Sequence, residues 1–178
     1  MINYDLEKIK DVDMNFVRQF LPFNTYKFMT LDNEHYKLLA YFASLYDNTT
    51  FYDLGSYKGN SAIALAANAN NQVISYDIGY FLEYARQPIN VEFRIGDFYR
   101  DKGLLNSPLI MVDVDPHDGD QESLFFNYLE TNKYKGIVIL DDIHLNKGME
   151  DFWRSVSQRK VDATKYGHYS GTGLVFFD

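Results

Sequence analysis

Aspartate stands at or beside the end of five short segments that are predicted to be buried β-strands. These residues are Asp53, Asp77, Asp97, Asp113 and Asp141. If the strands are parallel, their carboxyl ends meet at one edge of the sheet, where ligands of such proteins bind. Gathered carboxylates repel one another, so the pattern predicts that cations or hydrogen-bond donors meet them there. A loop aspartate that caps the next helix explains any one of them equally well, but five in register favour a binding edge.

The acids are densest in two stretches. Residues 112–120 hold four aspartates and His117, and residues 140–144 hold Asp141, Asp142 and His144. Clusters of oxygen ligands favour Mg²⁺, Ca²⁺ or Mn²⁺, and a chain without cysteine offers no thiolate for a softer metal. Acidic enrichment at a helix N-terminus explains Asp118 and Asp120. Asp113, Asp141 and Asp142 lie on or directly after buried strands, and are the predicted ligands of a divalent cation, Mg²⁺ first.

A glycine turn follows the first predicted strand, at residues 53–61, Asp-Leu-Gly-Ser-Tyr-Lys-Gly-Asn-Ser. Glycine breaks the strand and lets a second backbone or a ligand approach closely, and Asn60 or Ser61 is suited to cap the following helix. A strand, a glycine turn and a helix form the opening unit of many cofactor-binding domains. The predicted cofactor-binding residues of this loop are Asp53, Gly55, Ser56, Gly59 and Ser61.

The acids around this turn bear on which cofactor it binds. The loop lacks the third glycine of GxGxxG, and the Asp53 carboxylate is unsuited to a pyrophosphate, which counts against NAD. It suits a cofactor with a positively charged end, such as the ammonium group of S-adenosylmethionine. Asp77 ends the second strand, where an acid typically binds the ribose hydroxyls. Asp97 is placed to accept from the adenine amino group or to line the same pocket.

The elements that must position these residues alternate along the chain. Strands are expected over residues 49–54, 72–77, 90–95, 107–113, 136–141, 160–165 and 173–177, and helices over 31–46, 60–70, 121–133 and 147–159, with a short helix or turn over 79–86. Thr30 or Asp32 is a plausible N-cap of the first long helix. The alternation predicts an α/β, Rossmann-like, seven-stranded and mostly parallel sheet with helices on both faces.

Composition limits the remaining possibilities. The 178 residues suit a single domain, 1–178, in which residues 1–30 form an N-terminal helical appendage that ends or kinks at Pro22. A net charge of −8 without a lysine and arginine cluster disfavours nucleic acid as a partner. No apolar run is long enough for a membrane span and the N-terminus lacks the pattern of a signal peptide, so a cytoplasmic location without membrane contact is expected. A homo-oligomer is compatible with the sequence.

With these motifs in place, residues 30–178 resemble the class I S-adenosylmethionine-dependent methyltransferases. Residues 53–61 are similar to the cofactor loop of that family, and residues 73–77 are similar to its ribose-binding strand. Within the class, the chain most resembles the metal-dependent O-methyltransferases of the catechol, caffeoyl-CoA and macrolide-sugar type. Asp113, Asp141 and Asp142 stand where that group holds its divalent cation. Residues 145–148 also resemble the group, and residues 171–177 resemble its final, antiparallel strand.

The resemblance implies methyl transfer from S-adenosylmethionine to a hydroxyl group of a small molecule, such as a sugar, assisted by a divalent cation. The plant and catechol enzymes carry a lysine three residues after the first metal aspartate, but this chain has Pro116 there. His117 and His144 are therefore the candidate catalytic bases, with His117 first because it shares a loop with Asp113. Two alternatives stay open: an NAD(P)- or nucleotide-binding α/β enzyme, and a non-catalytic cofactor-binding module of the same fold.

Overall fold

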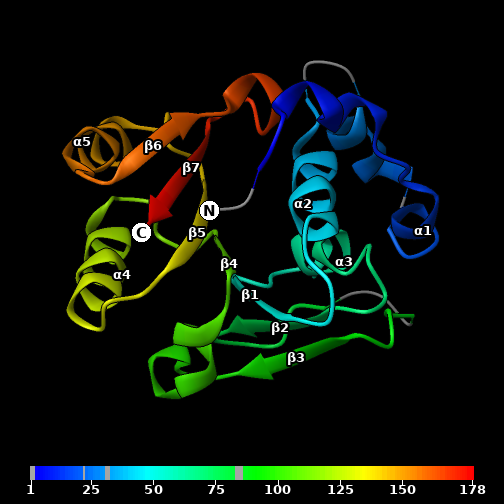
Figure 1. The fold of residues 1–178 in the computed structure, drawn as a ribbon, viewed down its shortest axis with the longest axis horizontal. Helices are drawn as coiled ribbons and strands as arrows, with labels where there is room; N and C mark the ends of the chain where they lie inside the picture. Colours follow the sequence, from blue (N-terminus) through cyan, green and yellow to red (C-terminus); the bar gives the residue numbers. More distant parts are fainter. Residues whose placement is uncertain (1–2, 22, 31–32, 83–85) are drawn as a thin grey trace.

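The computed structural model of the chain describes residues 3–21, 23–30, 33–82 and 86–178. Its centre is a seven-stranded sheet in the order β3-β2-β1-β4-β5-β7-β6 (Figure 1). The strands are β1 (Thr50–Leu54), β2 (Gln72–Asp77), β3 (Val91–Ile95), β4 (Leu109–Val112), β5 (Gly136–Asp141), β6 (Arg159–Asp162) and β7 (Thr172–Phe177). The predicted fold class is confirmed, because β1 to β5 pair in parallel and β7 pairs antiparallel to both β5 and β6.

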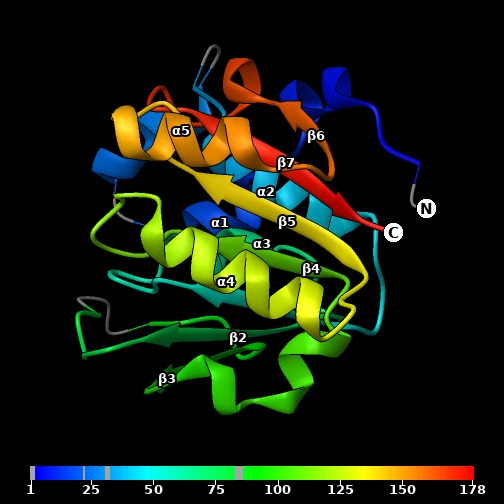
Figure 2. The same ribbon diagram turned by 90° about the vertical axis from the view of Figure 1, so that its left-hand side faces the viewer.

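Helices cover both faces of the sheet (Figures 1 and 2). The helices α2 (His35–Ser44) and α3 (Asn60–Leu65) lie on one face, and α4 (Asp120–Thr131) and α5 (Lys147–Ser155) lie on the other. Side chains of β1 alternate accordingly. Phe51 packs in the core beside α2 and α3, whereas Tyr52 and Leu54 pack in the core beside α4 and α5. Strands that are buried on both faces require nearly continuous apolar sequence, as β4 and β5 have.

Several boundaries differ from the sequence prediction. The helix expected over 60–70 ends at Leu65, and its N-cap is Gly59 in the left-handed region rather than Asn60 or Ser61. The helix expected over 147–159 ends at Ser155, and β6 begins earlier, at Arg159. Residues 79–82 are not helical, and residues 83–85 of the predicted helix or turn lie outside the described residues.

The N-terminal residues form short helices instead of one long one. These are η1 (Leu6–Asp11) and η2 (Phe23–Met29), which are 3₁₀ helices, and α1 (Asn15–Arg18). Ile9, Val17 and Met29 are buried in the same core as α2 and α3, so the segment packs onto the domain. The predicted break at Pro22 and the predicted cap at Asp32 fall outside the described residues. The first long helix begins at His35, and the side chain of its N-cap, Glu34, makes no capping hydrogen bond to the helix.

None of the helices within the described ranges is long and apolar enough to cross a membrane. The sheet order places a topological switch between β1 and β4, where the chain first builds toward β3 and then returns to build toward β5. Ligands of open α/β sheets bind at the carboxyl ends of the strands at such a switch. The loops that follow β1, β2, β4 and β5 are therefore the place to look for a site.

Candidate active site

The turn between β1 and α3 passes directly over the end of β4. The backbone amides of Gly55 and Ser56 donate to the carbonyl of Tyr76, at 2.9 and 3.0 Å. Gly55 has a φ of +98°, and a Cβ atom placed on it would lie 1.7 Å from the carbonyl oxygen of Asp113. Only glycine fits this position, because it tolerates the positive φ and leaves room for the neighbouring backbone. The turn therefore sets the distance between the predicted cofactor loop and the first predicted metal ligand.

Asp53 lies fully buried beneath this turn. The hydroxyl of Ser75 donates to its Oδ2 atom at 2.5 Å, while its Oδ1 atom has no hydrogen-bond partner. Burial raises the pKa of Asp53 to about 6, and the hydrogen bonds from Ser75 and Ser61 limit the rise. A buried carboxylate oxygen without a partner raises the free energy of the folded protein. Oδ1 of Asp53 therefore lacks a positive charge or a hydrogen-bond donor in this loop.

Replacing Asp53 by asparagine is expected to remove a pH dependence of stability. The folded pKa of about 6 lies above the ordinary value of 3.8, so the folded protein binds the proton more tightly. Its free energy of unfolding therefore falls as the pH rises from about 4 through about 6, by up to about 3 kcal/mol. Urea denaturation of both proteins at about pH 4 and about pH 8 measures this. We expect the variant to gain stability over the wild type only at the higher pH, and an equal difference at both would contradict the assignment.

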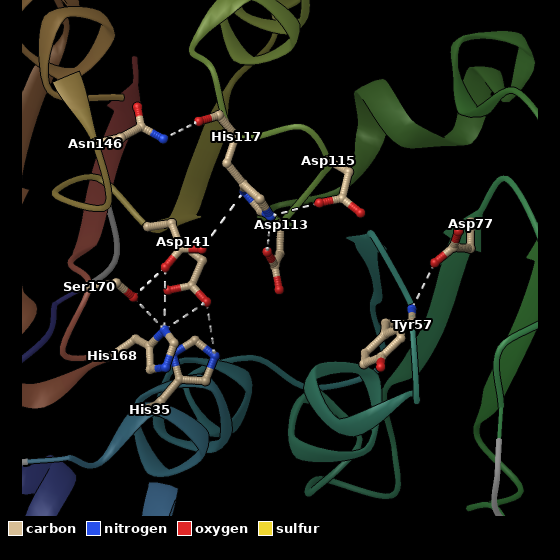
Figure 3. Close-up of polar contacts among 11 residues, drawn as sticks. His35, Tyr57, Asp77, Asp113, Asp115, His117, Asp141, Asn146, His168 and Ser170 are labelled. Atoms are coloured by element: carbon tan, nitrogen blue, oxygen red, sulfur yellow. Dashed lines mark hydrogen bonds and ion pairs between the residues drawn. The ribbon is translucent and has the colours of Figure 1, made fainter. Parts of the chain in front are cut away.

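Asp77 ends β2 beside a cavity of about 220 Å³. Its Oδ2 atom accepts from the backbone amide of Tyr57 at 2.7 Å (Figure 3). Its Oδ1 atom accepts from the backbone amide of Ile78 at 2.7 Å. The cavity has mainly aromatic and aliphatic walls, formed with Asp77 by Ser56, Tyr57, Gly79, Tyr80, Phe81, Leu82, Phe93, Arg94 and Ile95. A carboxylate at one end of an apolar slot is suited to a ligand with a flat ring and vicinal hydroxyl groups.

The structure does not place Asp97 on that cavity wall. Its side chain caps the short 3₁₀ helix Phe98–Arg100 by accepting from the amide of Tyr99 at 3.0 Å, and it pairs with Arg100 at 3.3 Å. The helix-capping explanation considered for a loop aspartate therefore describes Asp97 well.

Asp113, Asp141 and Asp142 lie at the ends of β4 and β5, where they belong to two overlapping groups: Asp113 with His117 and Asp142, and Asp141 with Asp142 and His168. Figure 3 shows the ring of His117 close to Asp113. The Nε2 atom of His117 is 3.7 Å from Asp113 Oδ1, and its Nδ1 atom is 3.8 Å from Asp142 Oδ2. Asp141 is 6% exposed, and its Oδ1 atom has no hydrogen-bond partner. Asp141 therefore has unfilled acceptor capacity in a place that water reaches poorly.

The carboxylates of the cluster influence one another's protonation. Burial, and then the charges of Asp141 and Asp142, raise the pKa of Asp113 well above its ordinary value. Burial also raises the pKa of Asp142, but hydrogen bonds from His168 and Ser170 and the charges of neighbouring histidines outweigh it and leave that pKa lowered. Hydrogen-bond donors and histidines therefore stabilise the negative charge of Asp142, whereas the charges near Asp113 mainly oppose its ionisation.

Two residues of the cluster have uncommon backbone conformations. His117 and Asp142 both have a positive φ, of 54° and 63°. Such conformations are rare outside glycine and persist where the surroundings enforce them, often at functional sites. Asn146, the N-cap of α5, donates from its side chain to the carbonyl of His117 at 2.7 Å and accepts from the amide of Met149 at 3.1 Å. The start of α5 thereby fixes the loop that carries His117.

Two histidines that the sequence did not single out complete the surroundings. His168, in the loop before β7, places Nδ1 at 3.5 Å from Asp141 Oδ2 and 3.4 Å from Asp142 Oδ1. His35, in the first turn of α2, places Nε2 at 3.9 Å from Asp141 Oδ2. Figure 3 shows both rings on the opposite side of the carboxylates from His117. No motif marks either residue, since each becomes adjacent to Asp141 only when the chain folds.

His144, the second predicted base, is not brought to the cluster. Its Nε2 atom lies 2.7 Å from Asp162 Oδ2, at the end of β6. It follows Asp142 by two residues, but the chain turns away from the carboxylates there. Of the two predicted bases, His117 is the one that the geometry favours.

A second cavity lies between the predicted cofactor loop and the carboxylate cluster. It has a volume of about 130 Å³ and shares Ser56 and Tyr57 with the cavity beside Asp77. The glycine turn lines one side of it, and Asp113, Asp141 and His168 line the other. Phe28 and Tyr36, from the N-terminal part of the chain, close it together with His35. A bound molecule can therefore extend from Asp77 along the turn and reach the carboxylates.

Comparison with known proteins bears on the fold. No family model matches the chain, and no curated protein matches it. Among solved structures, it is similar to the O-methyltransferase TomG from Streptomyces achromogenes in complex with S-adenosylmethionine, with 17% identity over 99% of this chain and 92% of that chain and a TM-score of 0.59. It is also similar to a putative caffeoyl-CoA O-methyltransferase from Staphylococcus aureus, with 14% identity over 99% and 93% and a TM-score of 0.61.

A third similar structure is the O-methyltransferase from Bacillus cereus in complex with S-adenosylhomocysteine, with 15% identity over 100% of this chain and 93% of that chain and a TM-score of 0.54. The chain has the fold of the class I S-adenosylmethionine-dependent methyltransferases, and these solved neighbours are O-methyltransferases. At this level of identity the likeness concerns the fold, and the chemistry must be argued from the residues in the cavities.

Proposed function

We propose that this protein is an S-adenosylmethionine-dependent O-methyltransferase that acts on a hydroxyl group of a small molecule with the help of a divalent cation. The observation that carries the proposal is the shared cavity, in which the glycine turn faces Asp113 and Asp141. In that arrangement a methyl donor on the turn and an acceptor at the carboxylates would meet in one enclosed space. Positioning of this kind supplies a large part of the rate of a group transfer.

The residues fit S-adenosylmethionine. Asp77 at the end of β2 would accept from the ribose hydroxyls, and the apolar slot beside it would hold the adenine. The unsatisfied Oδ1 of Asp53 lies under the turn that would hold the positively charged methionine end. Two of the solved neighbours hold S-adenosylmethionine or its product S-adenosylhomocysteine. When bound, this cofactor supplies a methyl group that is already activated on a sulfonium.

The residues also fit a divalent cation. Asp113, Asp141 and Asp142 would hold it, and the unpartnered buried Oδ1 of Asp141 and the mutual repulsion of the carboxylates are what such an ion would relieve. When bound, a divalent cation orients a substrate hydroxyl group and lowers its pKa. His117, whose ring nitrogens lie 3.7 Å from Asp113 and 3.8 Å from Asp142, would accept the proton of that hydroxyl group as a general base. Phe28 and Tyr36 would exclude water from the acceptor side.

Ligand-dependent melting separates this function from its alternatives. S-adenosylhomocysteine at about one hundred times its dissociation constant is expected to raise the melting temperature by about 5 °C or more. NAD at the same concentration is expected to leave it unchanged. Protection by NAD but not by S-adenosylhomocysteine would replace the proposal with a nucleotide-binding enzyme. Protection by S-adenosylhomocysteine without turnover on any hydroxylated acceptor would indicate a non-catalytic module.

A further inference from the structure

His168 occupies a place in the carboxylate cluster that an ordinary surface histidine would not. Its backbone amide donates to Thr172 Oγ1 at 2.8 Å, which fixes the loop at the start of β7. Its ring packs edge-on against Phe28 and Tyr169, with centroids at 5.2 and 4.5 Å. The imidazole is thereby held with Nδ1 turned toward Asp141 (Figure 3) and toward Asp142.

The separations within this group match those of metal ligands. Nδ1 of His168 lies 3.5 Å from Asp141 Oδ2 and 3.4 Å from Asp142 Oδ1. The hydroxyl of Ser170 lies 2.7 Å from the same Nδ1 atom and donates to Asp142 Oδ1, so a bound ion would take the place of the proton that His168 and Ser170 share. Ligands about 2.1 Å from a tetrahedral ion are about 3.4 Å apart. Nδ1 therefore already lies at the separation from each carboxylate oxygen that a shared ion would require, and one ligand atom from each of the three residues lies within 4.8 Å of the others.

The buried polar groups around the three atoms point to a missing partner. Asp141 is 6% exposed and lines the cavity, and its Oδ1 atom accepts no hydrogen bond. His35 is 5% exposed and lines the same cavity, with Nε2 3.9 Å from Asp141 Oδ2 and Nδ1 without a partner. Buried polar groups normally find partners, so groups left unsatisfied around one cavity indicate that a ligand belongs there.

We propose that His168 ligates the cation together with Asp141 and Asp142, and that the site thereby prefers a borderline transition ion such as Co²⁺ or Zn²⁺ to Mg²⁺. Mg²⁺ is bound mainly by oxygen, whereas an imidazole nitrogen suits first-row transition ions. The proposal rests on the cation site of the proposed function and refines it, since Mg²⁺ was the ion expected from the carboxylates alone. His35 stands beside the same carboxylate as a second imidazole.

Calorimetric titration with Co²⁺ and, separately, with Mg²⁺ tests this in the wild type and in His168→Asn. We expect the substitution to lower the affinity for Co²⁺ by at least about tenfold and that for Mg²⁺ by less than about threefold. His144→Asn is the matched control, because that histidine pairs with Asp162 and lies outside the cluster. It is expected to change neither affinity. Equal losses for the two ions, or no loss of Co²⁺ affinity, in His168→Asn would overturn the proposal.

A spectroscopic readout on the wild type guards against a variant that does not fold. Mn²⁺ bound in place of Co²⁺ is expected to show ¹⁴N modulation from a directly bound imidazole in pulsed electron paramagnetic resonance, and its absence would overturn the proposal. Titration with S-adenosylhomocysteine on the same preparations keeps the two ideas apart. If S-adenosylhomocysteine does not bind the wild type, the proposed function fails. If it binds, but the affinity for Co²⁺ does not depend on His168, only the present inference fails.

Discussion

Replacing Asp141 and Asp142 together by asparagine is expected to lower the affinity for a divalent cation by at least about 100-fold. The substitution removes both carboxylates at the end of β5 and leaves Asp113 as the one remaining carboxylate of the three assigned to the cation. Left-handed backbone at position 142 is no obstacle, because asparagine adopts it as readily as aspartate. Calorimetric titration with Mg²⁺ and Co²⁺ measures the loss, and circular dichroism checks that the fold is kept.

The control for this experiment carries the same change of charge elsewhere. Asp11 and Asp178 are exposed and lie far from the cluster in sequence, so Asp11→Asn with Asp178→Asn removes two carboxylates without touching the cavity. We expect this control to bind cations as the wild type does. Binding of S-adenosylhomocysteine is expected to persist in both double variants, since Asp77 and the glycine turn are unchanged. An equal cation affinity in the wild type and in Asp141→Asn/Asp142→Asn would contradict the assignment of these two residues as ligands.

The second large effect concerns stability. Gly55→Ala is expected to lower the free energy of unfolding by more than about 3 kcal/mol, because two costs combine. The added Cβ would stand 1.7 Å from the carbonyl oxygen of Asp113, which cannot move without displacing β4. The φ of +98° adds about 1–2 kcal/mol of conformational strain for a residue other than glycine. Urea denaturation with a two-state fit measures the change.

Gly96→Ala separates the two costs. Gly96 also follows a strand and has a φ of +139°, but a Cβ atom there would meet nothing within 4 Å. Gly96→Ala is therefore expected to lower the free energy of unfolding by the conformational strain alone, about 1–2 kcal/mol. The difference between the two variants reports the contact between the glycine turn and the end of β4. Equal losses would mean that this close approach does not constrain the site.

Much of this arrangement could be predicted from the sequence, because it follows from local patterns. Continuous apolar runs gave β4 and β5, and an aspartate directly after each could be expected at one edge once the strands were taken as parallel. Gly55 could be expected to turn sharply, since glycine after a buried strand has few other roles. The seven-stranded sheet with its antiparallel final strand is confirmed on the same grounds.

The rest depends on long-range packing that no local pattern records. His35 and His168 come from opposite ends of the chain and meet only because α2 and the loop before β7 pack at the same end of β5. Asn60 or Ser61 was expected as the cap of α3, but Gly59 takes that position and Ser61 lies buried within the helix. His144 was expected near Asp141 because it is close in sequence, yet its ring faces Asp162. For each of these histidines a tertiary contact decided the position of the side chain.

Binding of S-adenosylmethionine measured by calorimetry tests the central claim most directly. The wild type is expected to bind it, and Asp77→Ala is expected to bind at least about tenfold more weakly, because a charged acceptor of ribose hydroxyls is worth about 1.5–3 kcal/mol per hydrogen bond. Asp97→Ala serves as the matched control and is expected to change the affinity by less than about threefold, since Asp97 caps a 3₁₀ helix outside the cavity. The absence of binding to the wild type and to both variants would contradict the assignment of this protein as a methyltransferase.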